Sequence, residues 1–182
     1  MFNIRKIQEN VIYEAVKAES NAEVANEVVY GDQGPDHTEH NPEWVKSTMR
    51  RLENRFEKDA LKKIRMSCQC GYGMDEKLAL VKELMSTAAS MEAFANSEKA
   101  KAAGLFCEDG ELFLQFYFCP CPMLAEVEKL ETNTWCQCTT GYSKILFEKA
   151  FACEVDVELL KSIKMGDDVC LMKIMLSNPN WG

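Results

Sequence analysis

The chain has 182 residues, of which 47% are hydrophobic, and it carries a formal net charge of −8 at pH 7. This length and composition suffice for a folded domain with its own apolar core, so disulfides are not needed to hold the fold together. The acidic balance argues against a nucleic acid or an anionic membrane as a partner, because both need clustered Lys and Arg. No stretch approaches the roughly 20 apolar residues that cross a bilayer.

The N-terminal segment has charges threaded through it and shows neither an apolar signal region nor a small-residue cleavage site. We therefore expect a cytoplasmic protein, in a compartment that keeps thiols reduced. The nine cysteines are an odd number, which fits a fully paired disulfide framework poorly. In the cytoplasm, closely spaced cysteines are more typical of metal binding or redox chemistry.

The first part of the chain is predicted to be helical. Residues 1–30 form an N-terminal helix in this interpretation, because apolar residues recur at helical spacing along it. Residues 31–41 are rich in Gly, Pro, Asp and Asn, which indicates a polar linker. The remaining residues, 42–182, are predicted to form an α+β domain that contains the closely spaced cysteines.

Within residues 42–182, a long helix is predicted from Pro42 to about Met66, since Asn41 precedes it as a capping residue. Two shorter helices follow, one beginning at Asp75 and one running from Ser90 to about Gly104. All three precede the first segment whose apolar residues alternate with period two.

Period-two alternation first appears from residue 105 to residue 118 and is interrupted by Glu108-Asp109-Gly110, a sequence typical of a hairpin turn. Prolines follow in Cys119-Pro120-Cys121-Pro122 and should end the second strand, because proline cannot donate to a ladder. The connection that comes next is expected to contain a helix from Leu124 to Leu130. These features predict a β-hairpin followed by a short helical crossover.

A second hairpin is predicted near the C-terminus. After a helix that begins at Thr139 or Thr140, strands over residues 154–163 and 169–176 flank a turn at Met165-Gly166-Asp167-Asp168. The predicted fold class is therefore α+β: N-terminal helices followed by a four-stranded antiparallel sheet, built from two β-hairpins, with helices on one face.

Three Cys-x-Cys pairs stand at the predicted junctions between elements. Loops at two such junctions can aim four thiolates at one ion, which suits a tetrahedral zinc site or an iron–sulfur cluster. One intervening residue is a less diagnostic spacing than the usual two, and six cysteines exceed the need of one site. The candidate metal ligands are Cys68, Cys70, Cys119, Cys121, Cys136 and Cys138. We expect Cys119, Cys121, Cys136 and Cys138 to lie close together.

Two other interpretations of the cysteines remain open. Cys138 precedes a predicted helix, whose dipole favours a thiolate, so Cys138 or Cys121 could be the nucleophile of a thiol-dependent enzyme. Alternatively, the cysteines are merely small buried side chains, which is the simplest interpretation of Cys107 and Cys153 in their apolar, strand-like surroundings.

The segment from Trp135 to Leu176 resembles a known family. Its Gly141-Tyr142, a short amphipathic helix, and Gly166-Asp167 followed by Cys170 are similar to the closing segment of the 4-vinyl-reductase-like ligand-binding domain. The same ending is similar to cysteine-rich bacterial proteins related to 2-amino-thiazoline-4-carboxylate hydrolases.

In zinc-bearing members of the 4-vinyl-reductase-like family, the hairpin supplies three ligands. Cys170 matches the last of them, whereas Leu159 and Ser162 occupy the other two positions. The resemblance therefore implies an apolar small-molecule pocket but not that family's zinc site. A metal in this chain would need the Cys-x-Cys pairs.

The sequence thus favours a domain that binds zinc or an iron–sulfur cluster through its Cys-x-Cys pairs, beside a pocket for a small apolar molecule. The first alternative is a thiol-dependent hydrolase that acts on a small sulfur heterocycle. The second is a ligand-binding domain with buried cysteines. A homodimer is compatible with each of these functions.

Overall fold

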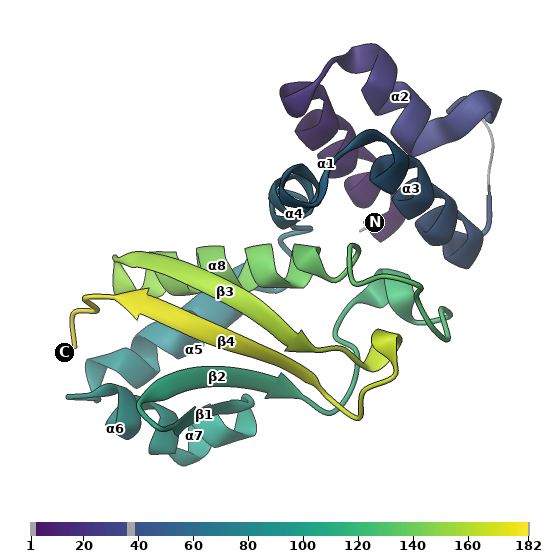
Figure 1. Ribbon diagram of the computed structural model, residues 1–182. Coiled ribbons are helices and arrows are strands. Elements are labelled where there is room, and N and C mark those ends of the chain that lie inside the picture. Colours follow the sequence, from purple (N-terminus) through teal and green to yellow (C-terminus); the bar gives the residue numbers. More distant parts are fainter. Residues whose placement is uncertain (1–2, 36–38, 182) are drawn as a thin grey trace. The chain divides into compact units, whose positions relative to one another are not determined.

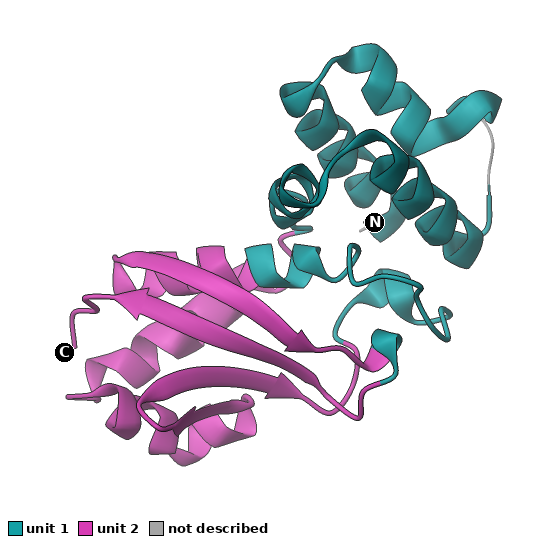
Figure 2. Cartoon of the chain, viewed as in Figure 1, with its two compact units in different colours: residues 1–70, 120–141, 164–166 teal, residues 71–119, 142–163, 167–182 magenta. Residues whose placement is uncertain are grey.

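The computed structural model describes residues 3–35 and 39–181, and these form two compact units (Figures 1 and 2). Unit 1 comprises residues 1–70, 120–141 and 164–166, and unit 2 comprises residues 71–119, 142–163 and 167–182. Each unit thus combines segments that are distant in sequence. The linker predicted at residues 31–41 lies inside the first segment of unit 1, and residues 36–38 of it lie outside the described part of the chain.

Unit 1 is mainly helical. Its helices are α1 (Ile4–Glu19), α2 (Ala22–Tyr30), α3 (Asn41–Arg55) and α4 (Lys58–Met66), with the short 3₁₀ turn η1 (Gly31–Gln33) after α2. Unit 1 also contains the 3₁₀ turn η2 (Pro122–Leu124) and the beginning of α8 (Gln137–Phe151). The helix Leu124–Leu130 expected from the sequence was wrong, because only η2 and irregular turns occupy this connection.

Two of the long predicted helices are each divided. The side chain of Asn21 accepts a hydrogen bond from the backbone N–H of Val24, so Asn21 starts a new helix where the sequence suggested a continuous one. Between α3 and α4, Phe56 adopts an extended conformation (φ −129°, ψ 142°), which ends α3. The helical assignment of both regions was therefore right, but their continuity was not.

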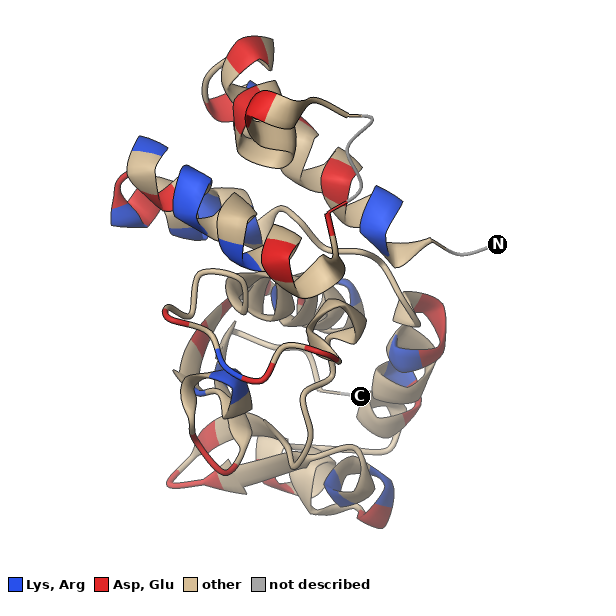
Figure 3. Cartoon of the chain, turned by 90° about the vertical axis from the view of Figure 1, so that its right-hand side faces the viewer, with Lys and Arg blue, Asp and Glu red and all other residues tan. Residues whose placement is uncertain are grey.

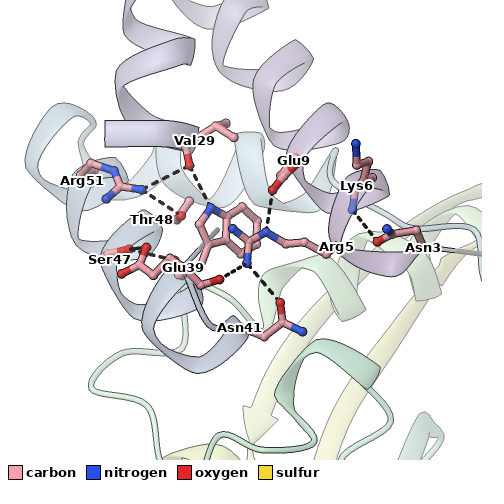
Figure 4. Close-up of polar contacts among 11 residues, drawn as sticks. Asn3, Arg5, Lys6, Glu9, Val29, Glu39, Asn41, Ser47, Thr48 and Arg51 are labelled. Carbon is pink, nitrogen blue, oxygen red and sulfur yellow. Dashed lines mark hydrogen bonds and ion pairs between the residues drawn. The ribbon is translucent and has the colours of Figure 1, made fainter. Parts of the chain in front are cut away.

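Arg5 joins α1 to the start of α3 (Figure 4). Its guanidinium pairs with Glu9 at 2.7 Å, donates to the Asn41 side chain at 3.1 Å and lies 3.9 Å from the centre of the Trp44 ring. Trp44 in turn donates its indole N–H to the backbone carbonyl of Val29, at the end of α2, at 2.8 Å. Polar contacts therefore fix α1, α2 and α3 to one another inside unit 1.

The sheet of unit 2 confirms the predicted fold class. Strands β1 (Leu105–Glu108), β2 (Glu111–Phe116), β3 (Glu154–Lys161) and β4 (Cys170–Ser177) form one antiparallel sheet in the order β1-β2-β4-β3. The two predicted hairpins are therefore joined through β2 and β4. The second hairpin is wider than a tight turn, because the 3₁₀ turn η3 (Ile163–Met165) precedes Gly166.

Helices cover one face of the sheet and enclose the core of unit 2. They are α5 (Met74–Ser86), α6 (Met91–Asn96), α7 (Glu98–Ala102) and the later turns of α8. Every second residue of the strands points into this core, as in Leu112 and Leu114 of β2 and Met172 and Ile174 of β4. No helix among the described residues is long and apolar enough to cross a membrane.

Candidate functional site

Two segments of unit 1 approach each other at Gly141. The ideal Cβ position of Gly141, in the first turns of α8, lies 1.9 Å from the carbonyl oxygen of Met66 at the end of α4. Only a residue without a side chain fits there, since real Cβ contacts are essentially never shorter than 3.0 Å. This close approach brings Cys68, just after α4, next to Cys138, in the first turn of α8.

Cys68 and Cys138 are buried free cysteines, and the thiol of Cys138 contacts the backbone of Cys68. The Cys138 thiol donates to the backbone carbonyl of Cys68 at 3.0 Å, and the Cys68 thiol donates to the carbonyl of Ile64 at 3.1 Å. The side-chain amide of Gln8, from α1, points at both residues: its nitrogen lies 3.4 Å from the Cys68 carbonyl and 4.0 Å from the Cys138 sulfur.

Three of the candidate ligands, Cys68, Cys70 and Cys121, lie near enough to Cys138 to act on it electrostatically. Burial raises the pKa of the Cys138 thiol to about 12; the charges of Cys121, Cys68 and Cys70 add to this effect, and the charge of Arg65 opposes it. Cys70 and Cys121 are half-buried free thiols, and the sulfur of Cys121 accepts a hydrogen bond from the indole N–H of Trp135 at 3.4 Å. We refer to Cys68, Cys70, Cys121 and Cys138 as the cysteine cluster.

The other two candidate ligands, Cys119 and Cys136, are not part of the cysteine cluster as defined here. Cys136 is buried in unit 1, directly before α8, whereas Cys119 belongs to unit 2, so the Cys119/Cys121 pair is divided between the units. The expected convergence of these two residues with Cys121 and Cys138 stays a prediction. Within residues 3–35 and 39–181, no three His, Cys, Asp or Glu side chains are already arranged to hold a metal ion.

The helix dipole and burial act in opposite directions on the Cys138 thiol. The sequence placed Cys138 before a helix, but α8 begins at Gln137 and includes it. The dipole of a helix N-terminus favours a thiolate, whereas burial raises the pKa of Cys138. Burial also raises the pKa of Cys68, against the opposing charge of Arg65. Both thiols are therefore protonated near neutral pH in the metal-free protein.

Arg65 is a further functional candidate, which the sequence analysis missed. Basic and acidic residues are interspersed along the helices (Figure 3). The side chain of Arg65 is fully buried, although that of Lys63, two residues earlier on the same helix, is 68% exposed. The guanidinium lies 4.4 Å from the centre of the Trp135 ring and donates one N–H to the Trp135 carbonyl at 3.0 Å.

The polar atoms around the cysteine cluster are incompletely satisfied. The Nε and Nη1 atoms of Arg65 are buried and have no hydrogen-bond partner, and the same holds for the side-chain oxygen of Gln8. Buried polar groups are paired in the great majority of cases, so unpaired ones mark strain or a missing partner. The signal in the sequence was the helical stripe Leu61, Ile64, Arg65 and Cys68, which places Arg65 on the buried side of α4.

No curated protein and no solved structure matches the chain. The resemblance of residues 135–176 to the 4-vinyl-reductase-like domain therefore stays a prediction. A family model does match: it covers residues 1–181, and the chain accordingly belongs to DUF6144, a protein family of unknown function.

Proposed function

We propose that the cysteine cluster of unit 1 binds a metal through thiolates, either as a zinc site or as an iron–sulfur cluster. The observation that carries this proposal is the contact between the Cys138 thiol and the backbone of Cys68, with Cys70 and Cys121 near enough for their charges to raise the pKa of Cys138. Four soft sulfur ligands are the set that tetrahedral zinc and iron–sulfur clusters take. The expected reducing cytoplasm would keep these thiols available for a metal.

The surroundings of the cluster also suit thiolate sulfur. The Trp135 indole N–H is directed at Cys121, and the Gln8 amide is directed at Cys138. Side-chain N–H groups of this kind orient and stabilise metal-bound ligands in proteins, where they form the shell around the ligands themselves. Thiolates accept such hydrogen bonds more strongly than thiols do, because charged acceptors form stronger bonds.

Binding requires two thiols to leave their present partners. The Cys68 and Cys138 thiols donate to backbone carbonyls, so their side chains must rotate and lose these hydrogen bonds. Each such bond contributes about 1 kcal/mol. The apparent free energy of structural zinc binding is about 10–16 kcal/mol at neutral pH. The present side-chain positions are therefore a small obstacle compared with the gain from coordination.

The experiment is to purify the protein under reducing conditions without chelators and to measure its zinc and iron content and its visible absorbance. We expect about one zinc ion per chain and no colour, or a brown protein that contains iron and sulfide. Cys68→Ser and Cys138→Ser should lose the metal. Cys107→Ser and Cys153→Ser, which alter half-buried thiols of unit 2, are the matched controls and should keep it.

A protein that contains neither metal, and that takes up no cobalt with thiolate-to-metal absorption, would overturn the proposal. The hydrolase alternative would then depend on Cys121, since burial keeps Cys138 protonated. Rapid single-site alkylation of Cys121 in the native protein would favour that alternative. The predicted pocket for a small apolar molecule stays a prediction.

A further inference from the structure

We infer that Arg65 supplies the positive charge that balances an anionic metal–thiolate centre, a role that rests on the proposed function of the cysteine cluster. It would then be a positioning residue, which acts on the metal through the ligands and does not contact the metal itself. Its guanidinium lies on the face of Trp135, whose indole N–H contacts the sulfur of Cys121. One aromatic side chain therefore connects the charge to the cluster.

The charge of Arg65 has no counter-ion within the described part of the chain. Arginine stays protonated in proteins, so burial cannot remove its charge. None of the ion pairs among residues 3–35 and 39–181 includes Arg65, although such pairs connect Lys63 with Glu19 and Arg55 with Glu27 on exposed faces. An unpaired buried charge is strongly unfavourable, so this position should be occupied by arginine only if an anion forms beside it.

The guanidinium of Arg65 lies near the thiols of the cysteine cluster. Its Nε and Nη1 atoms are buried without a well-formed hydrogen bond, while the third nitrogen donates to the Trp135 carbonyl. The charge of Arg65 lowers the pKa of both Cys68 and Cys138, and a side-chain hydrogen bond between Arg65 and Cys68 adds to this effect on Cys68, so the guanidinium is close to both thiols. The anion that we expect beside the Arg65 guanidinium is therefore a cysteine thiolate.

The proposed metal–thiolate centre would itself be negatively charged. A divalent ion held by four thiolates carries two negative charges, and a four-cysteine iron–sulfur cluster is also anionic. Such a centre is unfavourable in a buried environment without a nearby cation. One arginine removes half of that excess charge for a divalent ion. The two unfavourable elements, a lone cation and an anionic centre, compensate each other when the metal binds.

The variant Arg65→Met should differ from the wild type in opposite ways without and with metal. Without metal, the variant should unfold at a temperature equal to or above that of the wild type, because an uncompensated buried charge is removed. With metal, its affinity for zinc should fall by about 10–100-fold, the usual effect of altering groups that surround metal ligands. A purely structural arginine would instead lower the stability of the metal-free protein and leave the affinity largely unchanged.

The experiment measures two quantities, the unfolding temperature of the chelator-treated protein and the zinc affinity by competition with a chromogenic chelator. Arg65→Lys keeps a cation and should recover part of the lost affinity. The matched control is Arg51→Met, because Arg51 is half-buried in unit 1 and donates to the carbonyls of Val28 and Val29 on α2. It should lower the unfolding temperature without changing the affinity.

Three outcomes would overturn the inference. If the wild type binds zinc and Arg65→Met binds it within about twofold as well, Arg65 has no role and the proposed metal site stands. If Arg65→Met loses both stability and affinity and Arg65→Lys restores neither, the arginine is structural. If the wild type binds no metal, both the inference and the proposed function fail.

Discussion

Gly141→Ala tests the contact on which the candidate site depends. In an ordinary helix, replacing glycine by alanine stabilises the protein by about 1 kcal/mol. Here the new Cβ would lie 1.9 Å from the Met66 carbonyl oxygen and must move to at least 3.0 Å, an opening of about 1.1 Å between the two backbones. The atom in the way belongs to the backbone and cannot rotate aside. The structure therefore predicts destabilisation where helix propensity alone predicts the opposite.

The magnitude follows from the competing effects. Overpacking of a well-packed interior costs about 1–3 kcal/mol, and a contact with rigid backbone belongs at the upper end of that range. After the gain in helix propensity, a net loss of about 2 kcal/mol remains. For a chain of this length, each kcal/mol lowers the unfolding temperature by about 2–4 °C. We therefore expect a fall of about 4–8 °C in thermal unfolding followed by circular dichroism.

The same shift should loosen the cysteine cluster. An opening of about 1.1 Å would lengthen the 3.0 Å hydrogen bond from Cys138 to the Cys68 carbonyl beyond its normal range. Alkylation of native Cys138, followed by mass spectrometry, should then be faster than in the wild type. Lys149→Ala, at an exposed position of the same helix, is the control and should change stability by no more than about 0.5 kcal/mol. An unfolding temperature at or above the wild-type value for Gly141→Ala would refute the reasoning.

Two further predictions concern the raised pKa of a thiol and the sheet. Burial raises the pKa of Cys138 from an ordinary 9.0 to about 12. As the pH rises, this thiol therefore ionises in the unfolded chain before it does in the folded protein, and the metal-free protein should lose stability between about pH 9 and pH 12. Chemical unfolding at several pH values measures this loss, and a smaller loss in Cys138→Ser identifies the share of Cys138, since the pKa of Cys68 is raised as well. Gly104→Ala should destabilise unit 2 more than Gly110→Ala. Both residues have a positive φ (+88° and +76°), but only a Cβ at position 104 would collide with backbone, since it would lie 2.0 Å from the Gln115 carbonyl oxygen. Equal urea midpoints would contradict this.

The sheet was predictable because its signals are local. Alternation with period two marks each strand, and Asp109 and Gly110 do adopt the left-handed conformations, φ +51° and +76°, that a short hairpin turn requires. The divisions within the helical regions were harder to see. Asn21 could have indicated the start of α2, since Asn is a favoured capping residue. Phe56, which ends α3, carries no such signal, because neither glycine nor proline stands there.

The candidate site was predictable only in its chemistry. Repeated Cys-x-Cys spacing identified the sulfur atoms, because a sequence motif names its own residues. Arg65 and Trp135 each stand three residues before a cysteine of the cluster, whereas Gln8 comes from α1, and only packing brings the three side chains together. The helical stripe that contains Arg65 was concealed because α4 also carries Lys58, Lys62 and Lys63, which are typical of a solvent-exposed basic helix. The contacts of Gln8 and Trp135 are long-range and leave no trace in local periodicity.

The choice of arginine over lysine at position 65 bears on the proposed role. A buried lysine readily loses its proton, so the site would become neutral whenever no anion is present. Arginine keeps its charge in both states, and under the proposed function the metal-free protein would retain an unfavourable interaction that metal binding would relieve. Arg65→Lys should therefore bind zinc with the uptake of an extra proton, and its affinity should weaken relative to the wild type as the pH rises. Arginine would make the balancing charge of the proposed centre independent of pH.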